Sequence, residues 1–137
     1  MGEGPFTAEY FGEKAEKLRN AGGEYGAATG RPRRVGPFDV IASKYGIRCQ
    51  GADEIALTKL DILSGHEEIE FPFTDVLDEC KPVFKTVKGW NQDISKCRKK
   101  EDLPKEALDY IRFIEDACEC RIRYVSVGAE RDAYIEL

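Results

Sequence analysis

A glycine-rich loop between residues 22 and 39 constrains the fold more than any other part of the chain. The segment reads GGEYGAATGRPRRVGPFD, and its glycines and prolines interrupt any regular helix or strand. Arg31, Arg33 and Arg34 lie in it close to Thr29. A guanidinium group donates two parallel hydrogen bonds to a carboxylate or phosphate, and the glycines let backbone amides approach the same ligand. The loop is therefore a candidate anion-binding site, and the alternative is a solvated basic turn.

The composition narrows the class of protein. A chain of 137 residues fits one domain, and 42% hydrophobic with 34% charged residues is typical of a globular protein rather than a disordered one. The net charge of −5 argues against nucleic-acid binding, including binding through the arginine loop and the basic residues 96–100. No segment approaches the roughly 20 apolar residues of a membrane span, and the N-terminus has no apolar signal core. We expect a cytoplasmic protein with no membrane or nucleic-acid partner.

The cysteines predict neither disulfides nor a metal site. Five is an odd number, and the spacing is irregular, which is typical of free thiols in a reducing compartment. Cys118 and Cys120 lack the spacing of a zinc site, and His66 is the single histidine of the chain. The five are Cys49, Cys80, Cys97, Cys118 and Cys120.

Three segments have the sequence signals of helices. Residues 7–20 follow a possible cap at Thr7 and stop at Gly22 and Gly23. Residues 38–45 have a short apolar face that Gly46 closes. Residues 104–118 begin with a proline and repeat apolar residues every three to four positions, which predicts the best helix of the chain.

Strand signals alternate with these helices and predict an α/β fold of short strands with flanking helices. Residues 55–60 are apolar enough for a buried strand, and residues 67–73 alternate as a half-buried strand does. Residues 121–127 and 133–137 are expected to pair with each other. Residues 75–88 are predicted to be a surface connection with a short extended piece around 82–84.

Two short motifs stand at predicted strand ends, where open α/β sheets bind ligands. The Asp61 carboxylate has the acceptors that the N1–H and N2 amine of guanine require, while the Lys59 stem can cover a purine face. Ser126 and Gly128 offer a hydroxyl and backbone amides to a base carbonyl. The alternatives are an ion pair or cap at Asp61 and a plain turn after Ser126.

In their order and spacing, these motifs resemble the C-terminal part of the adenylosuccinate synthetase family. That family joins L-aspartate to IMP at the expense of GTP in purine (AMP) synthesis. The resemblance runs nearly end to end through residues 4–6, the arginine loop, 57–65, 89–90, 103–104, 110–111, 114–115 and 125–128. It implies the C-terminal part of a P-loop-NTPase-like fold. Residues 1–137 would be a single C-terminal domain or fragment without the N-terminal phosphate-loop part.

The resemblance also implies roles for individual residues. Thr29 and Arg31 would hold the aspartate carboxylates, and Arg31 would also reach IMP. The whole aspartate and IMP loop would be Ala27, Ala28, Thr29, Gly30, Arg31, Pro32 and Arg33. The GTP contacts would be Arg33, Lys59, Leu60, Asp61, Ser126, Val127 and Gly128. Ala28, Pro37 and Ala129 depart from the family's common threonine, tryptophan and proline.

The resemblance further implies that the chemistry needs parts that this sequence lacks. GTP is the co-substrate, and Mg²⁺ is expected for the whole enzyme, with its ligands outside this chain. No glycine-rich phosphate loop ending in Lys-Ser/Thr occurs here, and no catalytic residue is assigned. The whole enzyme is expected to be a homodimer, and this chain alone is expected to be inactive. The alternative function is a non-catalytic guanine-nucleotide-binding module.

Overall fold

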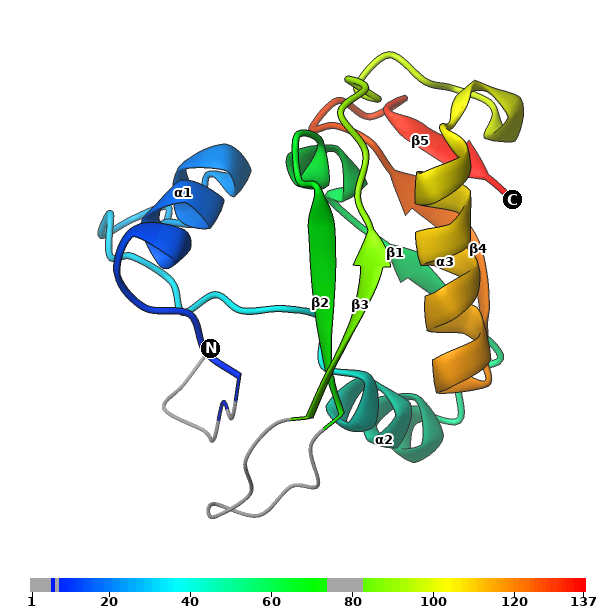
Figure 1. The fold of residues 1–137 in the computed structure, drawn as a ribbon, viewed down its shortest axis with the longest axis horizontal. Coiled ribbons are helices and arrows are strands. Elements are labelled where there is room, and N and C mark those ends of the chain that lie inside the picture. The colour runs from blue at the N-terminus through cyan, green and yellow to red at the C-terminus, as the bar shows by residue number, and fades with distance from the viewer. Residues whose placement is uncertain (1–5, 7, 74–82) are drawn as a thin grey trace.

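A computed structural model describes residue 6 and residues 8–73 and 83–137. Helices and strands alternate, and the strands form one three-stranded and one two-stranded sheet (Figure 1). This arrangement confirms the mixed α/β class. The elements are α1 (Gly12–Gly22), α2 (Val40–Gln50), β1 (Glu54–Leu57), η1 (Leu60–Leu63), β2 (Glu68–Phe73), β3 (Val83–Lys88), η2 (Lys100–Asp102), α3 (Lys105–Cys118), β4 (Arg121–Ser126) and β5 (Tyr134–Glu136).

The three-stranded sheet has the order β1-β4-β5. Strand β4 lies in the middle, parallel to β1 and antiparallel to β5, with Leu57 beside Val125 and Val125 beside Ile135. The predicted pairing of the last two strands is therefore confirmed. Because β1 and β4 run in parallel, their carboxyl ends reach the same edge of the sheet.

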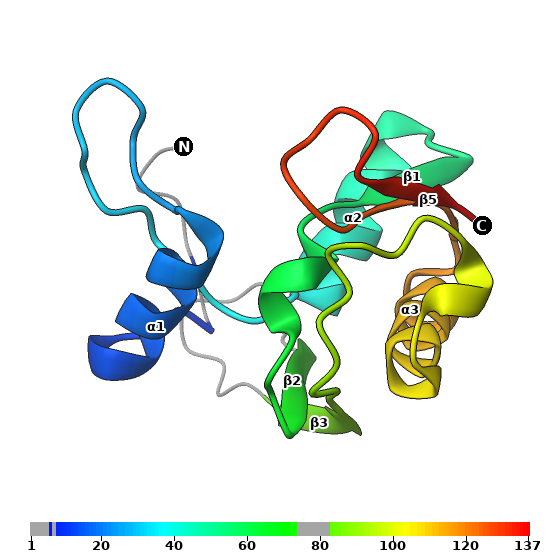
Figure 2. The same ribbon diagram turned by 90° about the horizontal axis from the view of Figure 1, so that it is seen from above.

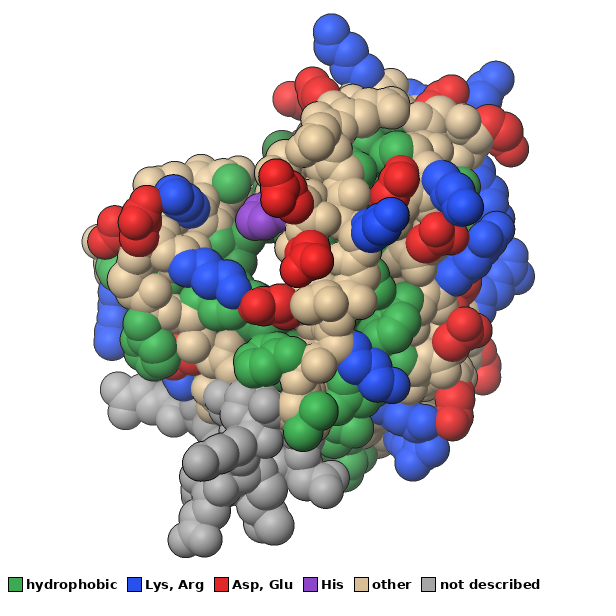
Figure 3. All heavy atoms as spheres, in the orientation of Figure 1, with side chains coloured by type: hydrophobic (Ala, Val, Ile, Leu, Met, Phe, Trp, Pro, Cys, Tyr) green, Lys and Arg blue, Asp and Glu red, His purple; other side chains and the backbone are tan. Residues whose placement is uncertain are grey.

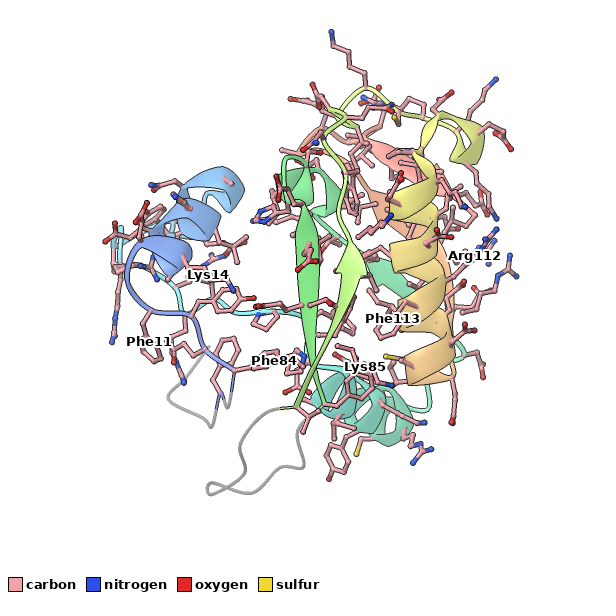
Figure 4. All side chains as sticks on the ribbon, viewed as in Figure 1. Phe11, Lys14, Phe84, Lys85, Arg112 and Phe113 are labelled. Carbon is pink, nitrogen blue, oxygen red and sulfur yellow. The ribbon has the colours of Figure 1, made fainter. Side chains whose placement is uncertain are left out.

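Aromatic side chains join the two-stranded sheet to α3. Phe71 of β2 is fully buried, with ring centroids 4.5 Å from Phe113 and 5.2 Å from Tyr110. Figure 4 shows Phe113 pointing from α3 toward the β2–β3 pair. The predicted periodicity of α3 is confirmed, since Ile111 and Ile114 are both buried in the core.

Helices α1 and α2 differ in extent from the sequence prediction, and α2 begins at Val40 instead of residue 38. Helix α1 begins at Gly12 instead of residue 7, and the predicted cap Thr7 lies outside the described residues. Its predicted end is confirmed, because Gly23 adopts the left-handed conformation with φ of 59°. Helix α2 continues through Gly46 to Gln50, so the expected end at Gly46 is wrong. Ile47 packs against the core beyond that glycine, which offsets the cost of glycine inside the helix.

Two strand predictions also need correction. The predicted strand 55–60 ends at Leu57, because Lys59 adopts a left-handed conformation with φ of 59° and η1 begins directly after it. The connection predicted over residues 75–88 contains β3, which pairs with the whole of β2. Strand β3 is mostly exposed, so its sequence lacks the alternation that marks a half-buried strand.

Helix α1 and the arginine loop stand apart from the rest of the molecule in both ribbon views (Figures 1 and 2). Lys14 points from α1 toward β2, and its Nζ lies 2.6 Å from Oε2 of Glu70 (Figure 4). Helix α1 contacts η1, and a Cβ at Gly22, its last residue, would lie 3.3 Å from Cδ1 of Ile62. The space-filling view shows an opening between these two attachments (Figure 3).

Candidate functional site

The arginine loop closes on itself like a short hairpin. The Arg33 amide donates to the Glu24 carbonyl at 3.0 Å, and the Gly26 amide donates to the Arg31 carbonyl at 2.8 Å. A Cβ at Gly26 would lie 2.9 Å from Oγ1 of Thr29, so a larger residue there would displace the Thr29 hydroxyl. The Thr29 hydroxyl in turn accepts from the Arg31 amide at 3.3 Å. The backbone therefore presents residues 27–33 as one compact loop.

The three arginines of this loop differ in whether another side chain holds their guanidinium groups. Arg33 Nη1 lies 3.0 Å from Oε2 of Glu24, and Arg34 Nε lies 2.7 Å from Oε2 of Glu9. Arg31 is exposed, and its guanidinium pairs with no other side chain that the structure describes. Arg31 is thus the loop arginine with the most donors available for an incoming anion.

The carboxyl ends of β1 and β4 bring the second group of predicted residues together. Leu57 pairs with Val125, so Thr58 and Ser126, the residues that follow this pair, lie side by side at the edge where β1 and β4 end. Leu60 is buried and fixes η1 against the core. The Lys59 side chain extends toward the end of α1. Its Nζ donates to the Gly22 carbonyl at 2.7 Å and to Oε1 of Glu24. The structure therefore joins this edge to the arginine loop.

Asp61 carries an unusual feature at this edge. Its Oδ1 is buried and has no hydrogen-bond partner among the described residues. Buried polar atoms are normally paired, since an unpaired one costs about 1–3 kcal/mol. An acceptor held in this way fits a ligand that brings its own donors to the edge.

The Ser126–Gly128 turn differs in part from the expectation. The Ser126 hydroxyl donates to the Gly128 carbonyl at 3.0 Å, which leaves its oxygen able to accept. The Val127 amide donates to the Ala133 carbonyl at 2.9 Å, and the Val127 side chain is fully buried. The expected exposure of backbone amides is therefore wrong for Val127, whose amide closes the turn into β5.

Glu24 lies within the candidate site, and no sequence pattern singled it out. Hydrogen bonds from Lys59 and then from Arg33 lower the pKa of its carboxyl, while partial burial acts in the opposite direction. Its sequence signal was a single carboxylate between the glycines of an arginine-rich loop. That signal is weak, because the partner Lys59 stands 35 positions away along the chain.

No group of three or more His, Cys, Asp or Glu side chains in the described part of the chain is arranged to hold a metal ion. No helix within the described ranges is long and apolar enough to cross a membrane.

Comparison with known proteins gives the family. The family model for adenylosuccinate synthetase matches residues 1–135. The chain belongs to the adenylosuccinate synthetase family. It is 42% identical to the adenylosuccinate synthetase of Aquifex aeolicus, covering all of this chain and 35% of that protein. It is 43% identical to the enzyme of Synechococcus sp. strain CC9902, over 98% of this chain and 34% of that protein.

A solved structure of this family has the same fold. The fully ligated adenylosuccinate synthetase from Plasmodium falciparum superposes with a TM-score of 0.89 at 35% identity, over 99% of this chain and 37% of that chain. The chain thus spans about a third of the length of these family members.

Proposed function

We propose that the chain is the C-terminal portion of an adenylosuccinate synthetase and supplies its guanine-binding and aspartate-binding surfaces. The whole enzyme ligates L-aspartate to IMP with GTP as co-substrate. Family membership supports this proposal, and so does the meeting of Lys59, Asp61 and Ser126 at one sheet edge. The partners would be IMP, L-aspartate and GTP.

The unpaired buried oxygen of Asp61 is the observation that carries the guanine assignment. Guanine presents two adjacent donors, N1–H and the N2 amine, which match the two oxygens of one carboxylate. Adenine has no such donor pair at this position. The Lys59 side chain would cover the purine face with its methylene groups, and the Ser126 oxygen would accept or relay a hydrogen bond.

The arginine loop would hold aspartate. Arg31 offers an exposed guanidinium, and its backbone amide donates to the Thr29 hydroxyl. Arg33 is joined through Glu24 to Lys59 at the guanine edge. Hydrogen bonds between charged groups contribute about 1.5–3 kcal/mol each, so loss of Arg31 should raise the aspartate requirement strongly. Magnesium would be bound by other parts of the enzyme.

Calorimetric titration tests the guanine assignment. The chain is titrated with GMP and with AMP, as wild type, as Asp61→Asn and as Asp53→Asn. Asp53 is an exposed carboxylate just before β1, so its variant has the same change of charge outside the site. We expect GMP to bind in preference to AMP and Asp61→Asn to lower GMP affinity at least about tenfold, or about 1.4 kcal/mol. Equal affinities for GMP and AMP, or equal effects of the two variants, would reject the assignment.

A further inference from the structure

Glu24 lies between the two halves of the proposed site and bonds to both. Its Oε2 accepts from Arg33 Nη1 at 3.0 Å within the arginine loop, and its Oε1 accepts from Nζ of Lys59 at the end of β1. Two backbone carbonyls accept hydrogen bonds from the same two residues. The Glu24 carbonyl accepts from the Arg33 amide at 3.0 Å, and the Gly22 carbonyl accepts from Lys59 Nζ at 2.7 Å.

We propose that Glu24 is a positioning residue that couples the guanine edge to the arginine loop. The inference rests on the proposed function, because it concerns the same two surfaces. One carboxylate holds Lys59 and Arg33 in a single network. A ligand that fixes Lys59 against a purine therefore also restricts Arg33, and an anion that fixes Arg33 restricts Lys59.

The exposure of these three side chains shows which of them a ligand can contact. The Glu24 side chain is 20% exposed, whereas those of Arg33 and Lys59 are 49% and 45% exposed. The carboxylate is thus the most buried member of the network, although its bonds to both cations lie at the protein surface. Both cations keep exposed surface for a ligand.

Packing beside Glu24 makes the connection stiff. A Cβ at Gly22 would lie 3.2 Å from Cγ of Glu24 and 3.3 Å from Cδ1 of Ile62 in η1. Glycine at this position lets the end of α1 sit closely against the element that carries Asp61. Helix α1 is also joined to β2 by the ion pair between Lys14 and Glu70, which involves neither half of the proposed site.

The first experiment uses no ligand. Amide hydrogen exchange and NMR shifts are compared for the wild-type chain, Glu24→Gln and Glu9→Gln. Glu9 pairs with Arg34 of the same loop but has no contact with Lys59, so its variant removes the same charge without cutting the network. We expect Glu24→Gln to raise exchange at Gly26 and Arg33 by about fivefold or more, the scale of typical coupling energies, and to shift residues 59–61. Glu9→Gln should leave residues 59–61 unchanged.

A second variant cuts the network from the opposite side. Lys59→Met removes the ammonium group at the sheet edge and should loosen the same amides at Gly26 and Arg33. Unchanged exchange in the loop would overturn the coupling. Unchanged shifts at residues 59–61 in Glu24→Gln would overturn it equally, whether or not the chain binds a nucleotide.

GMP then separates the coupling from the proposed function. In the wild type, GMP should shift the amide of Arg33 together with residues 59–61, and in Glu24→Gln only residues 59–61. If GMP binds but never shifts Arg33, the coupling is wrong and the guanine assignment stands. If GMP does not bind the wild type, the guanine assignment fails, and the ligand-free experiment alone decides whether the network exists.

Discussion

Asp61 and Glu24 show how differently two carboxylates are treated at the residue scale. Glu24 has a cationic partner on each oxygen, whereas one oxygen of Asp61 is buried without any described partner. The first arrangement stabilises the ligand-free fold, and the second costs free energy until a ligand supplies donors. The role proposed for Asp61 was predictable from its neighbours in the sequence, which place it after a strand. The ion pairs of Glu24 were not predictable, because its partner Lys59 is distant in the sequence.

Asp61→Asn should leave the ligand-free chain as stable as the wild type or slightly more so. The substitution removes a charge whose oxygen is buried and unpaired, so the free energy of unfolding should stay the same or rise by up to about 1 kcal/mol. Chemical denaturation without nucleotide measures this quantity. A loss of more than about 1 kcal/mol would mean that Asp61 has a structural partner in the fold.

The contribution of Glu24 to stability should depend on pH in a defined direction. Lys59 and Arg33 lower the pKa of this carboxyl below its usual 4.5, so the folded state favours the ionised form. Its stabilisation is therefore complete above about pH 5 and is lost as the pH falls through the lowered pKa. The difference in unfolding free energy between the wild type and Glu24→Gln should be constant from pH 7 to about pH 5 and shrink at lower pH. A difference that grows on acidification would contradict the ion pairs.

At the scale of elements, the sequence predicts a helix or strand best where a single local pattern determines its secondary structure. Helix α3 follows from its apolar period, and its buried Ile111 and Ile114 lie where that period placed them. Tertiary contacts decide the rest. Helix α2 passes Gly46 because Ile47 packs on the core, and exposed β3 is held by its pairing with β2. The turn at Lys59, which directs the proposed site, has a left-handed conformation that its residue type does not indicate.

Two glycine substitutions, one within α2 and one directly after it, should have opposite effects on the free energy of unfolding. Gly46 lies inside the helix, and a Cβ there would meet no atom within 4 Å, so Gly46→Ala should stabilise the chain by about 0.5–1 kcal/mol. Gly51 ends the helix with φ of 61°, where alanine is strained, so Gly51→Ala should destabilise by about 1 kcal/mol. Thermal or chemical unfolding compares the two. A loss of stability in Gly46→Ala would show that α2 is broken at that residue.

At the scale of the whole molecule, the chain spans about a third of the length of the enzymes it resembles. The fold class followed from the alternation of helix and strand signals in the sequence. The family resemblance implied that residues 58–61 and 126–128 share one site, and the parallel pairing of β1 with β4, which no sequence pattern indicated, brings them together. The sequence did not predict how α1 and the arginine loop attach to this sheet. That attachment depends on side-chain pairs between distant residues, namely Lys14 with Glu70 and Glu24 with Lys59.

The purified chain alone should form no adenylosuccinate from GTP, IMP and L-aspartate. Phosphoryl transfer from GTP needs a phosphate-binding loop, and the sequence has no glycine-rich loop that ends in Lys-Ser/Thr. Chromatographic detection of product after long incubation is the measurement. Product above the level of a heat-treated sample would show that this chain contains catalytic groups that neither its sequence nor its structure reveals.

NMR titration of the isotope-labelled chain with GMP, and separately with AMP, reports guanine binding at the sheet edge residue by residue. We expect GMP to shift the resonances of Lys59, Asp61, Ser126 and Gly128, and AMP to leave them in place. A well-dispersed spectrum in which GMP moves none of these residues, or in which both nucleotides move them equally, would contradict guanine binding at the edge where β1 and β4 end.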